Sequence, residues 1–420
     1  MESARLACCD VVNHAKVDEV LERQGVMATI IDYLEHEFAT FEEVPFNPVD
    51  SLILSEFCMV RMEGVLEPSE TGVRSGVFGR ISERFFPAKH AQFRDALRAE
   101  FYDDMFTGLV PSKVKELALA LAASPRFRDV VVTRYASVFD GDGPVQFAAY
   151  SFTYKDLFTY VGFRGTDTSF AGWREDFDMA YMQSVPAQEY AARYLEDVAP
   201  YVPGALIVGG HSKGGNLAIY AAANASDKVL SRIERVYCHD GPGFRRDVFS
   251  KEQVERTAPL VHKTVPQDSV VGMLMETRAA YRVVHSDAKG IMQHDPFSWQ
   301  VDGRDFVYDA RLSDGALFMD RVFDEWLSRY SDNELRVIVD ALFEVFEASG
   351  TINLSELFSG GAKMVGGLMD AARTASGKTR GVLTGAAATL SEVVFKNVGG
   401  DLSQIFRRGV SGVLRPRAEE

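Results

Sequence analysis

The stretch GGHSKGGNLAIYAA, residues 209–222, sets a serine and a lysine side by side among four glycines. Glycine-rich turns of this kind either cradle a phosphate or hold a nucleophile at the end of a strand. A phosphate-binding loop has the pattern G-x-x-x-x-G-K-[ST], in which the lysine directly follows the last glycine. Here Gly215 and Asn216 occupy the lysine and hydroxyl positions, and Lys213 comes too early. The stretch therefore does not fit a nucleotide-binding loop.

The same residues fit the G-x-S-x-G template of a nucleophile held in a tight strand-to-helix turn. Gly210 and Gly214 flank Ser212 at the two required positions, because larger side chains there would collide with the neighbouring strand and helix. The apolar run ALIV precedes the motif and NLAIYAAA follows it, as the template demands. We predict that Ser212 is a nucleophile; the alternative is a structural turn with an idle serine.

Hydrolases of this type take their catalytic residues in the order serine, acid, histidine. Two acids follow strand-like runs after Ser212: Asp240 ends RVYCHD, and Asp268 follows PLVHKTVPQD. We favour Asp268, because Asp240 leads straight into a Gly-Pro turn. Two histidines follow Asp268. His285 lies inside the strand-like run YRVVHS and is expected to be structural, so we favour His294, which lies in a loop beyond it.

These residues predict an acyl-serine mechanism. Ser212 attacks a carbonyl, His294 takes and returns the proton, and Asp268 orients the imidazole. The oxyanion needs two donors, which we assign to the backbone N–H of Lys213 and to Thr166. Thr166 ends the sequence FRGT, in the loop that follows a predicted strand; a plain turn is the alternative for that loop. The Lys213 side chain is expected to extend to solvent, or else to meet an anionic group of the substrate.

The regions around the motif predict an α/β fold. Three β-branched and aromatic runs at 128–140, 145–154 and 157–166 indicate consecutive strands. From about residue 155 to 300, helical stretches alternate with short apolar strands, which indicates a mostly parallel sheet with helices on both faces. We expect an N-terminal helical segment packed on the core (1–125), the α/β core (126–330) and a helical, weakly basic tail (331–420).

Five motifs follow one another along the chain: FRGTD (163–167), WRED (173–176), GGHSKGGNLA (209–218), Gly-Pro (241–242) and VPQDSVV (265–271). This arrangement resembles the class 3, fungal-type lipases of the α/β-hydrolase superfamily. It resembles more closely a bacterial family of lipase-like α/β-hydrolases, which also carries an N-terminal segment like residues 30–57 and an HD…SW end like residues 294–299. The resemblance covers roughly residues 27–305 and implies an α/β-hydrolase fold.

The resemblance also implies roles and a reaction. The reaction is hydrolysis of a lipid-like or acyl ester without metal or cofactor, and the rival reading is a catalytically idle fold that serves as a binding or scaffold protein. Fungal-type lipases have an apolar residue after the nucleophile and a secretion signal, whereas this chain has a lysine there and no apolar leader. The matching positions are Ser212, Asp268 and His294 for the triad, Thr166 and Lys213 for the oxyanion donors, and Trp173 and Asp176 for bracing of the oxyanion loop.

The composition of the chain argues against some classes of binding partner and bears on the cellular compartment. The chain of 420 residues has a formal net charge of −15, which argues against general nucleic-acid binding. Its four cysteines are too scattered for a disulfide framework or a Cys-x-x-Cys zinc site. With no apolar signal region and no run of 18 apolar residues, we expect a cytoplasmic protein.

The C-terminal stretch from residue 361 has nine Lys/Arg and five Asp/Glu, a balance of +4 on an acidic chain. A weakly basic, moderately apolar helix can lie on an anionic bilayer, with Arg407, Arg408, Arg415 and Arg417 at the headgroups. The alternative, which we favour, is a helix or tail packed on the acidic surface of the enzyme itself. Glycines at 366, 367, 381 and 385 weaken an isolated helix there.

Overall fold

The computed structural model describes residues 28–66, 90–140, 145–167, 169–276, 278–349 and 361–398. The chain divides into two compact units, Met1–Ser313 and Asp314–Glu420. The expected N-terminal segment and the α/β core thus share one unit. The second unit begins before the expected boundary at residue 331, because helix α13 (Asp314–Leu327) packs against α17 (Gly377–Val398).

A nine-stranded sheet organises the described part of the first unit, in the order β1-β2-β3-β4-β5-β6-β7-β8-β11. Strands β4 to β8 are parallel, while β1 to β3 and β11 add antiparallel pairs at the two sides. A separate hairpin joins β9 (Val301–Asp302) to β10 (Asp305–Phe306). The nine strands are β1 (Ala91–Gln92), β2 (Val130–Asp140), β3 (Val145–Tyr154), β4 (Phe158–Phe163), β5 (Ala205–His211), β6 (Ile233–His239), β7 (Val261–Pro266), β8 (Tyr281–Val284) and β11 (Tyr308–Asp309).

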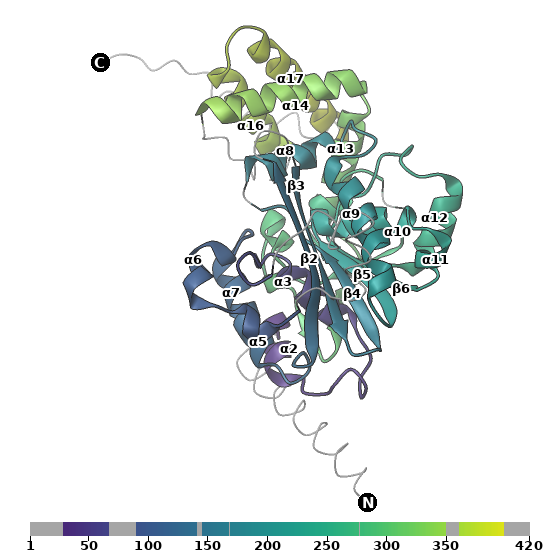
Figure 1. Ribbon diagram of the computed structural model, residues 1–420. Helices are drawn as coiled ribbons and strands as arrows, with labels where there is room; N and C mark the ends of the chain where they lie inside the picture. Colours follow the sequence, from purple (N-terminus) through teal and green to yellow (C-terminus); the bar gives the residue numbers. More distant parts are fainter. Residues whose placement is uncertain are drawn as a thin grey trace, which may run out of the picture. The chain divides into compact units, whose positions relative to one another are not determined.

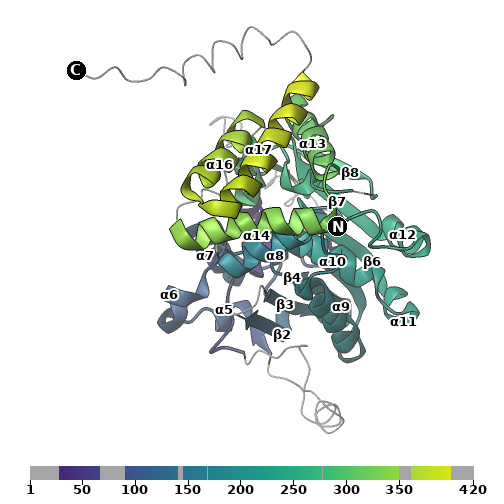
Figure 2. The same cartoon turned by 90° about the horizontal axis from the view of Figure 1, so that it is seen from above.

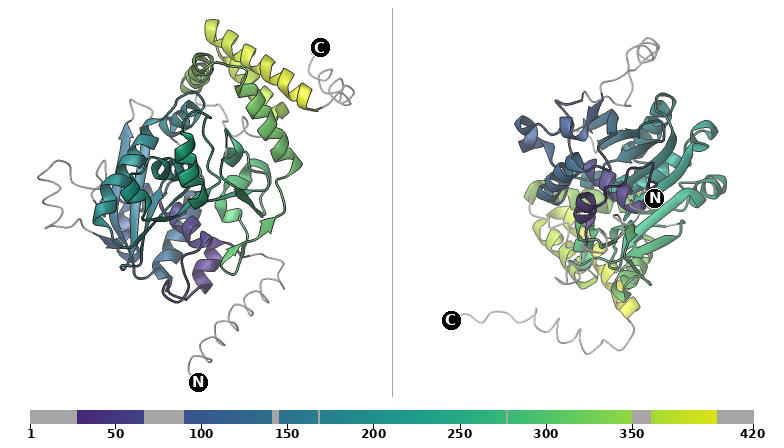
Figure 3. Two further views of the ribbon diagram at one scale, coloured as in Figure 1. Left: turned by 90° about the vertical axis from the view of Figure 1, so that its right-hand side faces the viewer. Right: turned by 90° about the horizontal axis from the view of Figure 1, so that it is seen from below.

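Helices cover both faces of this sheet (Figure 1). On one face α10 packs over β4, β5 and β6 and α9 packs beside it over β3, and on the other face α3 packs on β4, β5 and β6. The two further views in Figure 3 show the same layers from other sides. The helices in the described part of the unit are α2 (Ile30–His36), α3 (Pro48–Phe57), α5 (Phe93–Ala96), α6 (Tyr102–Met105), α7 (Pro111–Ala123), α8 (Phe170–Asp178), α9 (Pro186–Val198), α10 (Lys213–Ala223), α11 (Asp227–Leu230) and α12 (Lys251–Thr257), with short 3-10 turns between them.

The predicted elements are confirmed where the sequence pattern was strong. The three consecutive strands are β2, β3 and β4, and the alternation that follows them gives β5-α10-β6 with parallel strand pairing. Each strand-helix-strand crossover returns the chain to the same edge of the sheet, which brings the carboxyl ends of β4, β5, β6 and β7 together. The protein therefore has a mixed α/β architecture with the strand-turn-helix arrangement of an α/β-hydrolase.

Helix α3 fixes the N-terminal segment to the sheet. Asn47 caps it by accepting hydrogen bonds from the backbone N–H groups of Val49 and Asp50, with Pro48 in its first turn. Asp50 is fully buried and pairs with the equally buried Arg126 at 2.6 Å. Breaking a buried pair of this kind leaves an uncompensated charge, so the pair ties the N-terminal helices to the start of the core.

The second unit is a group of helices: α13, α14 (Asp332–Ser349), α16 (Gly361–Thr374) and α17 (Gly377–Val398) (Figure 2). Helix α17 packs against the other three described helices and buries apolar side chains that include Leu383, Leu390 and Val393. These side chains are therefore not free to enter a bilayer. The four arginines at 407–417 lie outside the described residues, so the membrane contact stays a prediction. No described helix combines the length and apolar character needed to cross a bilayer.

Gly385 gives a direct test of how helix α17 is stabilised. It lies exposed in the helix interior, and a Cβ added there would meet nothing within 4 Å. Gly385→Ala is expected to stabilise the protein by about 0.5–1 kcal/mol in thermal or urea unfolding, because alanine loses less backbone entropy. Gly303→Ala is the matched control: its surroundings are equally open, but its φ of +56° disfavours alanine. Equal effects of the two substitutions would contradict this account.

Candidate active site

Ser212 sits in a strained turn between β5 and α10. Its backbone has a φ of +56°, which a residue with a Cβ rarely adopts. A Cβ on Gly210 would lie 2.3 Å from the backbone of Gly214, and one on Gly214 would lie 2.2 Å from the carbonyl oxygen of Phe163. Gly210 is therefore required by the close approach of β5 to the start of α10, and Gly214 by the close packing of the turn on the end of β4.

Three side chains form a hydrogen-bonded chain at this turn. His294 Nε2 lies 2.9 Å from Ser212 Oγ, and His294 Nδ1 lies 2.6 Å from Asp240 Oδ2. Asp240 follows β6 and is fully buried; its Oδ1 accepts hydrogen bonds from Ser269 Oγ and from the backbone N–H of Gly272. Burial alone would raise the pKa of Asp240, but His294 and Ser269 outweigh it and lower that pKa below its usual value. The carboxylate thus stays ionised beside the imidazole.

The expectation that Asp268 orients the histidine is wrong. Its Oδ2 accepts a hydrogen bond from the backbone N–H of Gly290 at 3.0 Å, and its own N–H donates to Gln293 Oε1. Asp268 shapes the loop before His294, but the acid on the imidazole is Asp240. The reason lies in the sheet order: β6 borders β5 directly, whereas Asp268 follows β7, one strand farther away.

The Gly-Pro turn that made Asp240 look unsuitable belongs to the site. A Cβ on Gly241 would lie 2.8 Å from the Ser212 carbonyl oxygen, so the turn packs directly against the nucleophile's backbone. His285 lies apart from the hydrogen-bonded chain of Ser212, His294 and Asp240, and its structural role stays a prediction. It follows β8, and its ring lies 2.9 Å from the Asp309 carboxylate in a pair that is more than a third exposed.

The loop after β4 faces the turn at Ser212. A Cβ on Gly165 would lie 2.9 Å from the carbonyl oxygen of His211, so the two loops touch through backbone. The Thr166 hydroxyl donates to Asp176 Oδ2 at 2.6 Å, which is the contact expected of a brace. Burial raises the pKa of Asp176 to about 7, against the lowering influence of Lys213 and Thr166. Trp173 lies partly buried on the same helix, α8, and its bracing role stays a prediction.

The Lys213 side chain does neither of the things expected of it. It is buried, and its Nζ donates to Glu175 and, at 3.2 Å, to the carbonyl oxygen of Gln146. Glu175 also accepts from the backbone N–H of Ala187 at 2.8 Å. The lysine therefore anchors α8, the helix that carries Asp176, to the turn at Ser212. The sequence motif WRED contains Glu175, but nothing in its spacing indicated a buried partner.

Removing one partner of this pair should be costly. Lys213→Met leaves Glu175 buried without a countercharge, and we expect a loss of about 3–5 kcal/mol in the free energy of unfolding measured with urea. The double substitution Lys213→Met/Glu175→Leu should recover much of that loss. Lys113→Met, in a half-exposed pair with Glu116, is the control and should change stability by less than about 1 kcal/mol. A similar small loss at both lysines would contradict the anchoring role.

A pocket of about 400 Å³, part of it open to solvent, lies over Ser212 and His294. Apart from Ser212 and His294, the wall of this pocket is mainly apolar, and most of it comes from the N-terminal segment and the loop after His294. Polar groups also line it, among them Glu56 on α3, which sequence analysis missed. The apolar lining residues are Met59, Leu109, Val110, Val114, Pro296 and Phe297, and the polar ones are Glu56, Thr166, His211 and Asp295.

His211, next to the serine, forms a second histidine-carboxylate pair. Its Nδ1 lies 2.9 Å from Glu56 Oε1, and its ring centroid lies 4.7 Å from that of His294. Burial would lower the pKa of His211, but the Glu56 carboxylate outweighs it and raises that pKa above the usual value. No signal in the sequence linked Glu56 to His211, because 155 positions separate them along the chain.

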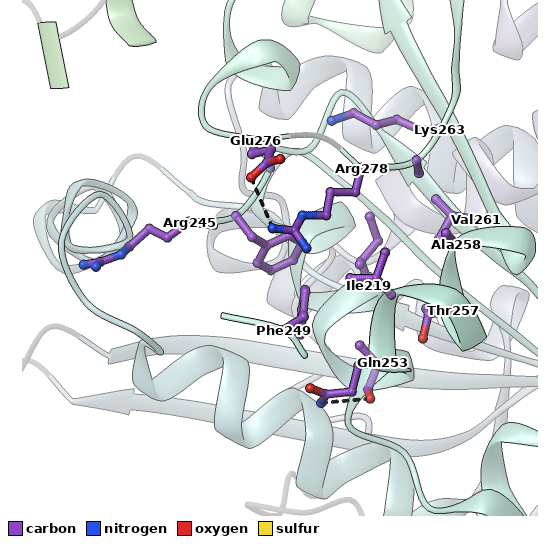
Figure 4. A pocket seen from close by; sticks show the side chains of 15 residues that line it. Ile219, Arg245, Phe249, Gln253, Thr257, Ala258, Val261, Lys263, Glu276 and Arg278 are labelled. Carbon is purple, nitrogen blue, oxygen red and sulfur yellow. Dashed lines mark hydrogen bonds and ion pairs between the residues drawn. The ribbon is translucent and has the colours of Figure 1, made fainter. Parts of the chain in front are cut away.

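A larger pocket lies elsewhere, between α10, α12 and β7 (Figure 4). It holds about 560 Å³, part of it open to solvent, and is lined mainly by apolar side chains such as Ile219 and Phe249. Arg278, labelled in the view, pairs with Glu276 beside it. None of its lining residues belongs to the hydrogen-bonded set of Ser212, His294 and Asp240, so the smaller pocket is the candidate active site. The described residues contain no cluster of three or more metal-binding side chains.

Solved structures of fungal lipases are similar to the chain, at low identity. The lipase of Rhizopus microsporus var. chinensis is 18% identical over 61% of this chain and 90% of its own, with a TM-score of 0.31. The Rhizomucor miehei lipase in its propeptide complex is 17% identical over 60% and 83%, with a TM-score of 0.30. Lipase II from Rhizopus niveus is 15% identical over 46% and 75%, with a TM-score of 0.29.

No curated protein matches the chain. A family model, Mbeg1-like, matches residues 121–344, which is more than half of the 420 residues. The match spans the sheet from before β2 to α14 and includes Ser212, Asp240 and His294. The chain therefore belongs to the Mbeg1-like family.

Proposed function

We propose that the protein is a serine hydrolase that cleaves carboxylic esters through an acyl-serine intermediate. The observation that carries the proposal is the hydrogen-bonded chain from Ser212 through His294 to Asp240, at a strained turn below a pocket. A serine is a weak nucleophile by itself, and a neighbouring imidazole oriented by a carboxylate is the usual means of activating it.

In the first step Ser212 Oγ attacks the ester carbonyl carbon, and its proton passes to His294 Nε2. Asp240 keeps Nδ1 protonated and stabilises the imidazolium that forms. The oxyanion is held by the backbone N–H groups of Thr166 and Lys213, which have no acceptor among the described residues. His294 then gives the proton to the leaving oxygen as the C–O bond breaks, which leaves an acyl-serine and a free alcohol.

In the second step water attacks the acyl-serine carbonyl, again with His294 as the base. The carboxylic acid leaves, and Ser212 regains its proton. The apolar wall formed by Met59, Leu109 and Val114 suits an acyl chain next to the reacting carbonyl. An ester of a short or medium-length acid is therefore the substrate class that we propose, and no bound metal or cofactor takes part in these steps.

A fluorophosphonate probe tests the proposal directly, because it reacts with an activated serine. The purified protein should be labelled at Ser212, as located by mass spectrometry, and should hydrolyse activated esters such as nitrophenyl butyrate. Preincubation with the probe should abolish that hydrolysis. A protein that is neither labelled nor active would favour the reading as a catalytically idle fold that binds a partner.

A further inference from the structure

The pocket over Ser212 has one polar side that the proposed ester hydrolysis does not use. Glu56, His211 and Asp295 lie along it, and the lining residues in the described part of the chain include no lysine or arginine. Glu56 is 5% exposed and His211 is 8% exposed, so both are largely withdrawn from water. Buried polar groups of this kind normally have hydrogen-bond partners.

Two atoms on this polar side of the pocket lack a hydrogen-bond partner. Glu56 Oε1 and His211 Nε2 are buried and have no hydrogen-bond partner of acceptable geometry among the described residues, although Glu56 Oε1 approaches His211 Nδ1 to 2.9 Å. Leaving such groups unpaired costs free energy in a folded protein. A substrate that supplies the missing partner would recover that cost on binding.

A purely structural role for His211 fits less well, as a neighbouring histidine shows. His239, one strand away on β6, is fully buried and has both ring nitrogens paired: Nδ1 with Thr264 Oγ1 at 2.8 Å and Nε2 with Ser51 Oγ at 3.0 Å. His239 is therefore an example of a core histidine in this fold whose hydrogen-bonding groups are both paired. His211 differs from it in lining the pocket and in leaving Nε2 unpaired.

The chemistry of the two atoms defines the group that would pair with them. A carboxylate oxygen only accepts hydrogen bonds, so Glu56 calls for a donor on the substrate, a hydroxyl or an ammonium group. His211 Nε2 accepts in the neutral ring and donates in the charged ring that Glu56 favours, and a hydroxyl can pair with it in either state. The two carboxylates of Glu56 and Asp295, beside the single imidazole of His211 and no lysine or arginine among the described lining residues, disfavour a substrate that carries a carboxylate or phosphate there.

We propose that Glu56 and His211 form a specificity subsite for a hydrogen-bond donor carried close to the scissile ester. The preferred substrates are then hydroxylated or amine-bearing esters, such as esters of polyols, amino alcohols or hydroxy acids, rather than plain alkyl esters or anionic ones. This inference rests on the proposed ester hydrolysis and names the substrate class of the same site.

Matched esters test it with the wild-type protein. On the alcohol side, propyl butyrate is compared with glyceryl monobutyrate and aminopropyl butyrate; on the acyl side, nitrophenyl butyrate is compared with nitrophenyl hydroxybutyrate. Monopropyl succinate supplies the anionic case. At least one donor-bearing ester should exceed its plain partner about tenfold or more in kcat/KM, as expected for a hydrogen bond to a charged acceptor. The succinate ester should be the poorest substrate.

Substitutions then connect the preference to the subsite. Glu56→Gln and His211→Asn should each reduce the ratio of kcat/KM for the donor-bearing over the plain ester toward one. Glu37→Gln is the matched control, because Glu37 is also a buried carboxylate of the N-terminal segment but pairs with Arg304 and does not line the pocket. Its ratio should equal that of the wild-type protein. The ratio is internal to each variant, so a partial loss of folded protein does not affect it.

Equal rates for plain and donor-bearing esters in the wild-type protein would overturn the subsite while leaving ester hydrolysis intact. A preference for the succinate ester, or a donor preference that survives in both Glu56→Gln and His211→Asn, would overturn it as well. Absence of all hydrolysis together with absence of Ser212 labelling would overturn the proposed function, and the subsite with it.

Discussion

Ser212→Ala is expected to abolish ester hydrolysis, with kcat/KM falling by a factor on the order of 10³ or more. Without the hydroxyl there is no nucleophile for the acyl-serine step, and the remaining oxyanion donors give only residual catalysis. Hydrolysis of nitrophenyl butyrate and covalent labelling by a fluorophosphonate should disappear together. Wild-type activity in this variant would remove the acyl-serine mechanism from consideration.

The fold should survive this substitution, which makes the result interpretable. The Ser212 side chain has one hydrogen bond in the described structure, to His294, and alanine meets the same backbone strain at a φ of +56° as serine does. The melting temperature should therefore change little. Ser231→Ala is the control, since Ser231 is an exposed serine in a turn after α11 and should keep full activity.

The sequence predicted the parts of the site that are local in the chain. The turn at Ser212 was readable because its glycines, its flanking strand and its helix all lie in one continuous stretch, residues 205–223, which is a single strand-helix unit. His294 followed from chain order and from the strand-like run before it. The family resemblance implied that Asp176 braces the oxyanion loop, and in the structure Asp176 accepts a hydrogen bond from Thr166 in that loop.

The parts that failed depend on contacts between distant segments. Choosing Asp268 over Asp240 required knowing which strand borders β5, and the strand pattern alone does not give the order of strands in a sheet. The partner of Lys213 is Glu175, which reaches it only because α8 folds back on the turn. Glu56 could not be connected to His211, because α3 crosses the sheet at a place that nothing in its own sequence specifies.

Asp240→Asn is expected to lower kcat/KM by roughly 10³- to 10⁴-fold, the size of effect seen when a triad acid becomes an amide. The amide of asparagine has the same shape as the carboxylate, but only its oxygen can accept a hydrogen bond. Since Ser269 Oγ and the Gly272 N–H both donate to Oδ1, the amide oxygen will occupy that position and the NH₂ group will face His294. The imidazole must then accept at Nδ1 and carry its proton on Nε2, so that it can no longer take a proton from Ser212.

Asp268→Asn provides the comparison, because the two residues follow neighbouring strands and both were candidates for the acid. Asp268 accepts one backbone hydrogen bond, from Gly290, and an amide oxygen can accept that bond equally well. Its kcat/KM should stay within about threefold of wild type, on the scale of a surface change that leaves the reacting groups in place. The two variants should be assayed side by side above pH 7 with nitrophenyl butyrate, and their folding compared by circular dichroism. A large loss at Asp268 with activity retained at Asp240 would reverse the assignment and show that the loop rearranges before the serine reacts.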